Sequence, residues 1–199
     1  MGDRTLPYFA ANAAAAVVIV AAFAAWVYSE YRIGRNRPAL GAKNRDGGSG
    51  RWVGIGLLAS YVGGALISAL VPRTVITGHG GTVFIAGLLI AVVGQGLRLA
   101  AVRQLGESFT FKIHTAPGQI VVDSGLYRFV RHPSYTGALI CALGFTIAYT
   151  NWLAPLTVLV LAFGYVKRIP AEEQALAADL GEPYRRYMSH TKRLIPFVL

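Results

Sequence analysis

Apolar residues occur along this chain in long runs that few charged residues interrupt. The first three runs cover about 8–28, 52–71 and 81–102. Each run has roughly the 20 residues that an α-helix needs to cross the ~30 Å hydrocarbon core of a bilayer. The first run is longer than the apolar part of a typical signal peptide, so we interpret it as a permanent span. The pattern therefore predicts three membrane-spanning helices.

A fourth apolar stretch, 134–166, is longer than one helix needs and contains no Lys, Arg, Asp or Glu. Turn-forming residues interrupt it near Asn151 and Pro155. We predict two short helices joined by a tight turn, Tyr135–Tyr149 and Trp152–Val166. At ~1.5 Å per residue each would be roughly 22 Å long, so each needs a thin bilayer or its flanking residues to cross.

Basic residues alternate between the two sides of these spans. They are frequent in 32–51, 103–132 and 167–199, whereas only Arg73 lies between spans two and three and none lies between spans four and five. The positive-inside bias then predicts that these three segments are cytosolic and that the N-terminus is outside.

The predicted fold class is an all-α polytopic membrane protein. We expect about five transmembrane helices, of which the last two form a tight hairpin, and a cytosolic C-terminal amphipathic helix. One integral membrane domain would cover 1–199. Within it, 1–102 would hold three spans and a cytosolic linker near 29–51, and 103–199 would be the catalytic part.

Composition agrees with a membrane location. Charged residues make up 14% of the chain, against about 25% in typical soluble domains, and the mean hydropathy is +0.49. The net charge of +10 flanks apolar segments instead of forming a basic stripe with interleaved aromatics, which argues against a nucleic-acid partner. Cys141 stands alone, so neither a disulfide framework nor a cysteine-based metal site is expected.

The tail after the last span contains RIPAEEQALAADLGEPYRRY. Pro170 suits the first turn of a helix, where Glu172 and Glu173 would face the positive end of the dipole. Gly181 and Pro183 are expected to interrupt this helix. Helical spacing predicts one apolar face that consists of Leu176, Leu180, Tyr184 and Tyr187. A surface helix that its glutamates merely cap would explain the same segment without any site.

The segment RHPSY stands at the start of the fourth span. Pro133 is expected to begin a helix whose unpaired N–H groups suit an anionic or polar ligand. Because spans four and five form a hairpin, the ends at 132–135 and 166–170 should meet. The alternative is that His132 is a satisfied structural group and that the nearby arginines anchor the protein at the interface.

The string GLYRFVRHPSYTG, the hairpin, the following R-x-x-x-EE and LGEPYRRY…RLIPF resemble the isoprenylcysteine carboxyl methyltransferase family. They also resemble phospholipid-methyltransferase-like membrane enzymes. The resemblance covers roughly residues 94–199. It implies an enzyme that transfers a methyl group from S-adenosyl-L-methionine to a lipophilic acceptor, with a carboxylate-bearing acceptor as one option, and releases S-adenosyl-L-homocysteine.

The same resemblance implies roles for individual residues. Arg168 matches an arginine assigned to the methyl-accepting substrate. The positions that match cofactor contacts are His114, Gln119, Ile120, Val121, Val122, Tyr127, His132, Pro133, Ser134, Tyr135 and Glu172. Phe109-Thr110-Phe111 stands where the eukaryotic enzymes have F-N-H, so the acceptor need not be a prenylcysteine.

The acceptor decides which catalytic residues are needed. A carboxylate acceptor needs no general base, and Arg168 could hold it by charge-assisted hydrogen bonds. An amine or thiol must lose a proton, for which His132 and Tyr135 are the nearest candidates. The expected partners are membrane lipids and a lipophilic or lipidated substrate.

Two other functions fit part of the pattern. Membrane NADPH-dependent sterol reductases carry an RHP-N-Y-x-x-E string, but Ser134 replaces the Asn here and no acid follows Gly137. A non-enzymatic membrane scaffold would need none of the polar residues for a ligand.

Overall fold

The computed structural model describes residues 6–35, 43–44, 47–109, 111, 114–115 and 120–196, with the backbone alone at 43–44, 107 and 114–115. The described chain is almost entirely helical, as predicted. Its α-helices are α1 Tyr8–Ala11, α2 Ala13–Gly34, α3 Gly50–Leu58, α4 Gly64–Leu70, α5 Gly80–Leu105, α6 Pro133–Ala148, α7 Val158–Leu180 and α8 Glu182–His190. A π-helical turn, Ala59–Gly63, joins α3 to α4. Short 3₁₀ turns lie at Pro72–Thr74, Gly106–Ser108, Gly125–Arg128 and Ala154–Thr157.

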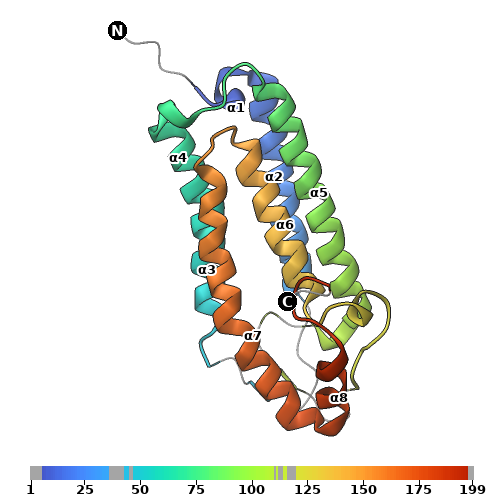
Figure 1. Ribbon diagram of the computed structural model, residues 1–199. Helices are drawn as coiled ribbons and strands as arrows, with labels where there is room; N and C mark the ends of the chain where they lie inside the picture. The colour runs from blue at the N-terminus through green and yellow to red at the C-terminus, as the bar shows by residue number, and fades with distance from the viewer. Residues whose placement is uncertain are drawn as a thin grey trace.

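Four helical stretches within the described residues are long and apolar enough to cross a membrane. They are Ala13–Gly34, Gly50–Leu70, Gly80–Leu105 and Ala154–Leu180, and the shorter apolar helix α6 accompanies them. In Figure 1, α2, α5 and α6 lie side by side, and α7 lies along α3 and α4. Large apolar side chains point outward from this bundle, for example Val17, Leu89, Val92 and Leu159. The chain is therefore a multi-pass integral membrane protein, as its composition indicates.

Glycines bring α5 and α6 into direct backbone contact. A Cβ atom added at Gly94 would collide with the backbone of Cys141, and one at Gly87 with the backbone of Ala148. From the other side, a Cβ at Gly137 would lie 2.6 Å from the Arg98 nitrogen. Small residues at a helix–helix interface allow this approach in a membrane, where packing rather than water exclusion drives association.

The tight turn predicted near Asn151 is confirmed. Thr150 has a positive φ of 52°, and the Asn151 carboxamide accepts a hydrogen bond from the Leu153 N–H at 2.9 Å. The Thr74 hydroxyl donates to the same oxygen at 3.0 Å, and the Ile76 N–H donates to the Thr150 carbonyl at 2.8 Å. The segment between α4 and α5 therefore holds the hairpin turn in place.

The last long helix differs from the prediction. The second arm of the hairpin does not end near Val166; α7 continues to Leu180, and Pro170 lies inside it. A proline removes one helical hydrogen bond, but burial of the neighbouring Ile169 and Glu173 keeps the helix continuous. The expectation that Pro170 begins a helix is therefore wrong, and Glu172 and Glu173 do not face a helix N-terminus. The predicted interruption at Gly181 is confirmed, because α7 ends there with φ 68°.

Two short pairings organise the loops at the α8 end of the bundle. Strand β1, Lys43–Asn44, pairs antiparallel with β2, His114–Thr115. The return segment, residues 191–196, follows α8 and runs back to the start of α6. Val130 forms a parallel bridge with Lys192, and the His132 N–H donates to the Arg193 carbonyl at 3.0 Å. The α6–α7 turn and α1 lie at the opposite end of the bundle (Figure 1).

Candidate active site

The two ends of the hairpin converge on a cavity of about 560 Å³. Its walls come from both halves of the chain. From the N-terminal spans and α5 the lining residues are Trp26, Glu30, Gly50, Arg51, Val53, Gly54, Leu57, Tyr61, Arg98 and Leu105. From the loop and the C-terminal helices they are Ser108, Phe109, Phe111, Ile120, Val121, Val122, Tyr127, Arg131, His132, Ser134, Tyr135, Ala138, Tyr165, Arg168, Glu172, Leu176, Leu180, Tyr184 and Tyr187.

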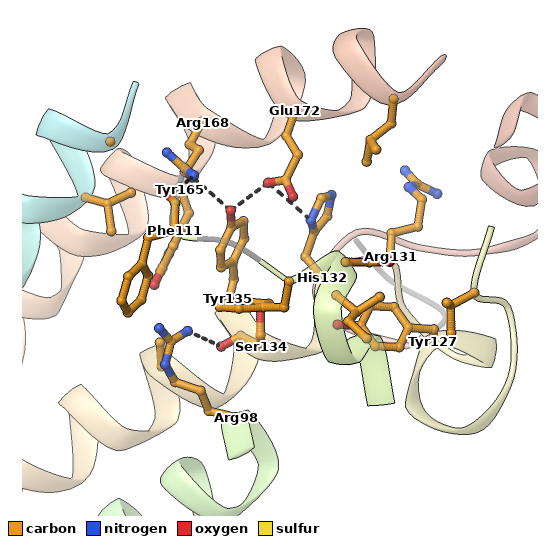
Figure 2. Close-up of a pocket in the computed structure, with 18 of the residues that line it drawn as sticks. Arg98, Phe111, Tyr127, Arg131, His132, Ser134, Tyr135, Tyr165, Arg168 and Glu172 are labelled. Carbon is orange, nitrogen blue, oxygen red and sulfur yellow. Dashed lines mark hydrogen bonds and ion pairs between the residues drawn. The ribbon is translucent and has the colours of Figure 1, made fainter. Parts of the chain in front are cut away.

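The Tyr135 hydroxyl joins the two ends of the hairpin. It donates to Glu172 Oε2 at 2.6 Å and accepts from Arg168 Nε at 2.8 Å. Arg168 and Glu172 are one helical turn apart on α7, so both reach the same hydroxyl (Figure 2). The predicted meeting of RHPSY with the start of KRIPAEE is therefore confirmed at the level of single atoms.

Arg168 is 4% exposed although it lies near the end of the apolar part of α7. Besides Tyr135, it donates to the Ser49 hydroxyl at 3.3 Å and to the Phe111 carbonyl. Three separate segments thus hold the guanidinium at the cavity wall.

An aromatic stack continues from this point along the cavity. The ring of His132 lies parallel to Tyr135, with centroids 5.3 Å apart, and Tyr135 stacks on Tyr165 at 4.4 Å. His132 Nδ1 lies 3.9 Å from Glu172 Oε2, and Nε2 lies 3.4 Å from Glu173 Oε1. The imidazole is thus fixed between two carboxylates and two rings.

The adjacent glutamates have different surroundings. Glu172 faces the cavity with its side chain 25% exposed. Glu173 is 3% exposed and binds Arg131 Nε at 2.7 Å and Arg193 Nη2 at 2.8 Å. Arg131 also donates to the Met188 carbonyl at 3.1 Å and to the Thr191 carbonyl. We call Glu173, Arg131 and Arg193 the clasp, because they fasten the return segment to α6 and α7.

Tyrosines and aliphatic side chains form the wall next to α8. The buried cluster there contains Ala101, Tyr127, Tyr184 and Tyr187, with Val121, Val122, Leu176 and Leu180 packed against it. The predicted apolar face of the tail is therefore confirmed. The Tyr187 hydroxyl donates to the Tyr127 carbonyl at 2.7 Å. Burial raises the pKa of the Tyr127 and Tyr187 hydroxyls above their ordinary value, so both remain protonated at neutral pH.

The first turn of α6 offers fewer free N–H groups than expected. The N–H groups of Tyr135 and Thr136 donate to the His132 carbonyl at 3.0 and 3.1 Å, and Pro133 has none. The His132 N–H is bound by the return segment. Among these residues, only the Ser134 N–H is left to face a ligand.

Most of the predicted site residues lie around this one cavity. Those that line it are Ile120, Val121, Val122, Tyr127, His132, Ser134, Tyr135, Arg168 and Glu172. Pro133 begins α6 and is fully buried, so its part is to set the helix start. The backbone of His114 lies in β2, but its side chain is outside the described residues, and Gln119 is outside them altogether.

Sequence reasoning missed the contribution of the N-terminal spans to the cavity. Trp26 and Tyr61 close its upper end with ring centroids 4.3 Å apart. Glu30 and Arg98 form an ion pair on its wall. Charged residues in or beside apolar spans are a signal that could have found this pair, because such residues are costly in a bilayer unless they have a use.

The family model of the isoprenylcysteine carboxyl methyltransferase (ICMT) family matches residues 86–178. The predicted resemblance is confirmed. The isoprenylcysteine carboxyl methyltransferase match includes the RHPSY segment, Arg168 and Glu172, whereas Trp26, Glu30 and Tyr187 lie outside it.

Curated relatives and a solved structure agree with this match. A probable protein-S-isoprenylcysteine O-methyltransferase of Oryza sativa subsp. indica is 36% identical over 115 residues, which are 56% of this chain and 60% of the relative. The human protein-S-isoprenylcysteine O-methyltransferase is 28% identical over 117 residues, which are 57% of this chain and 41% of the relative. The structure of the eukaryotic intramembrane Ras methyltransferase ICMT superposes with a TM-score of 0.60 at 26% identity, over 73% of this chain and 52% of that one. The matched part of this chain thus spans 60% of the rice protein and 41% of the human one.

Proposed function

We propose that this protein transfers a methyl group from S-adenosyl-L-methionine to a lipophilic acceptor. The observation that supports this most is that one cavity joins a polar region at Tyr135, Arg168 and Glu172 to an apolar region below Trp26 and Tyr61. A water-soluble donor and a lipid-soluble acceptor can then meet without either leaving its own phase.

The described residues fit the donor chemically. The side chains of Val121, Val122 and Leu176 next to Tyr127 form an apolar wall that suits a flat purine. Glu172 accepts one hydrogen bond from Tyr135 and keeps its second oxygen for an ammonium or a ribose hydroxyl. The donor supplies an electrophilic methyl group on a sulfonium, which leaves as a neutral thioether.

Catalysis by the protein would then consist chiefly of alignment. In-line transfer needs the acceptor atom behind the methyl carbon, and correct orientation of two reactants is worth up to about 7–11 kcal/mol. Arg168 is held by Tyr135, Ser49 and Phe111, so its guanidinium can fix an acceptor carboxylate in one position. A carboxylate acceptor needs no base, which agrees with a Tyr135 hydroxyl that already donates to Glu172.

We further propose that the cavity opens on the cytosolic side and that the N-terminus lies outside. This rests on the basic residues of 32–51, 103–132 and 167–199, which flank the α8 end of the bundle. The curated relatives are named protein-S-isoprenylcysteine O-methyltransferases, so a prenylated cysteine carboxylate is the first acceptor to test.

The test uses the purified full chain in lipid nanodiscs with methyl-labelled S-adenosyl-L-methionine. One sample receives a farnesylated N-acetylcysteine, a second receives its methyl ester as a blocked control, and a third receives a total lipid extract. We expect a base-labile label in the first sample and none in the second.

Binding of S-adenosyl-L-homocysteine and of NADPH is measured in parallel by calorimetry. Binding of NADPH without S-adenosyl-L-homocysteine would overturn the proposal in favour of a reductase. Binding of neither, with no labelled product in any sample, would favour a scaffold.

A further inference from the structure

A buried ion pair joins the N-terminal spans to the start of α6. Arg98 on α5 binds Glu30 on α2 through two contacts, Nε to Oε1 and Nη2 to Oε2, both 2.7 Å long. The side chains are 8% and 18% exposed. Arg98 Nη1 also donates to the Ser134 carbonyl at 3.3 Å, a contact that Figure 2 shows inside the cavity.

Fold stability alone does not account for this pair. Burying two charges costs as much as their attraction returns, and well-packed apolar residues usually serve a core at least as well. Charged residues inside a membrane bundle point instead to a functional site. Gln95 donates to Glu30 Oε1 at 3.2 Å, so the carboxylate is held on two sides and faces Arg98 in one orientation.

The charge of the cavity wall shows what the pair does. The basic residues among the described lining are Arg51, Arg98, Arg131 and Arg168, and the acidic ones are Glu30 and Glu172. The charge of Arg131 is matched by Glu173, and that of Arg98 by Glu30. Without Glu30, the wall beside the RHPSY segment would carry an extra unmatched cation.

Such a cation would act on the two forms of the cofactor differently. The methyl donor carries a sulfonium cation, whereas the product is a neutral thioether of nearly the same shape. Charge–charge energies in a protein interior are several-fold larger than in water, so an unmatched guanidinium in the same cavity would weaken donor binding far more than product binding.

We propose that Glu30 is a specificity-determining residue that cancels the charge of Arg98 and thereby keeps the cavity selective for the cationic donor over its neutral product. The inference rests on the proposed function and adds a contribution from α2, which lies outside the family match at 86–178. Arg98 in turn is a positioning residue, because it reaches the cofactor segment through the Ser134 carbonyl.

The test is Glu30→Gln, which keeps the shape of the side chain and removes its charge. Dissociation constants for S-adenosyl-L-methionine and S-adenosyl-L-homocysteine are measured by calorimetry on the full chain in nanodiscs. We expect donor affinity to fall about tenfold or more while product affinity falls at most about threefold. The matched control is Glu182→Gln, which removes the acid of an exposed pair with Arg186, 61% and 79% exposed. It should leave both constants unchanged.

A double variant, Glu30→Gln with Arg98→Gln, separates charge from structure. It leaves no unmatched charge, so it should fold even if the single variant does not. The ratio of the two constants should return to within about twofold of the wild-type ratio. A purely structural role would leave the double variant at least as impaired as the single one and would lower both affinities together.

The outcomes distinguish the two hypotheses. If the wild type binds both compounds and Glu30→Gln leaves their ratio unchanged, the inference is overturned and the proposed function stands. If the ratio does not recover in the double variant, the inference is overturned in the same way. If the wild type binds neither compound, the proposed function fails and the inference fails with it.

Discussion

Glu172 and Glu173 show how far a single residue's role depends on its direction. Successive side chains on a helix point about 100° apart, so Glu172 reaches the cavity and Glu173 reaches the clasp. The sequence located both acids near the RHPSY segment, but it placed them at a helix start. Their roles differ because of Arg131 and Arg193, whose positions depend on the loop and on the return segment.

Two substitutions at this scale should have opposite signatures. Glu172→Gln should weaken S-adenosyl-L-homocysteine binding at least about tenfold, because a charged hydrogen-bond acceptor is lost, and should leave the melting temperature unchanged. Glu173→Gln should lower stability by about 3 kcal/mol, because it leaves the buried Arg131 without its partner. Calorimetry and thermal unfolding measure the two effects, and equal effects of both substitutions would contradict the assignment.

Arg168 gives a third prediction at the same scale. Arg168→Gln should raise the KM for the acceptor at least about tenfold and change donor affinity less than threefold, because a charge-assisted hydrogen bond to the acceptor is lost. Initial rates at varied acceptor and donor concentrations separate the two constants. An equal loss for donor and acceptor would mean that Arg168 acts on Tyr135 rather than on the acceptor.

At the scale of helices, apolar runs and turn residues were enough to predict the spans, the hairpin and the break at Gly181. They were not enough to predict the length of α7. Pro170 and the charges that follow it are typical of a helix boundary, yet packing of Ile169 and Glu173 against the rest of the chain carries the helix through. The cavity walls from α2 and α3 were likewise not predictable, because Trp26 and Tyr61 have no local motif around them.

Contact between α5 and α6 can be tested with two glycines on one helix. Gly94→Leu should destabilise the bundle by at least about 1–3 kcal/mol, because the new side chain would collide with the Cys141 backbone. Gly96→Leu should be tolerated, since nothing lies within 4 Å of a Cβ there. Thermal unfolding of the two variants in the same detergent makes the comparison, and similar midpoints would argue against a close α5–α6 interface.

At the scale of the molecule, the cavity is a product of the entire described fold rather than of the matched region alone. Trp26→Ala should lower kcat/KM for a prenylated acceptor about tenfold, because burying a large aromatic side chain's worth of apolar contact contributes about 1.5–3 kcal/mol. Donor affinity should stay within about twofold. If donor affinity falls as well, α2 supports the fold of the site instead of binding the acceptor.

The return segment has a consequence for biosynthesis. Residues 192–194 supply the Lys192, Arg193 and Leu194 carbonyls that bind Arg131, His132 and Thr136. Translation is directional, so α6 enters the membrane before the groups that secure its first turn have been made. The sulfonium pocket therefore matures only after residue 194 has emerged from the ribosome, and a nascent chain arrested before that point would be inserted yet incompetent.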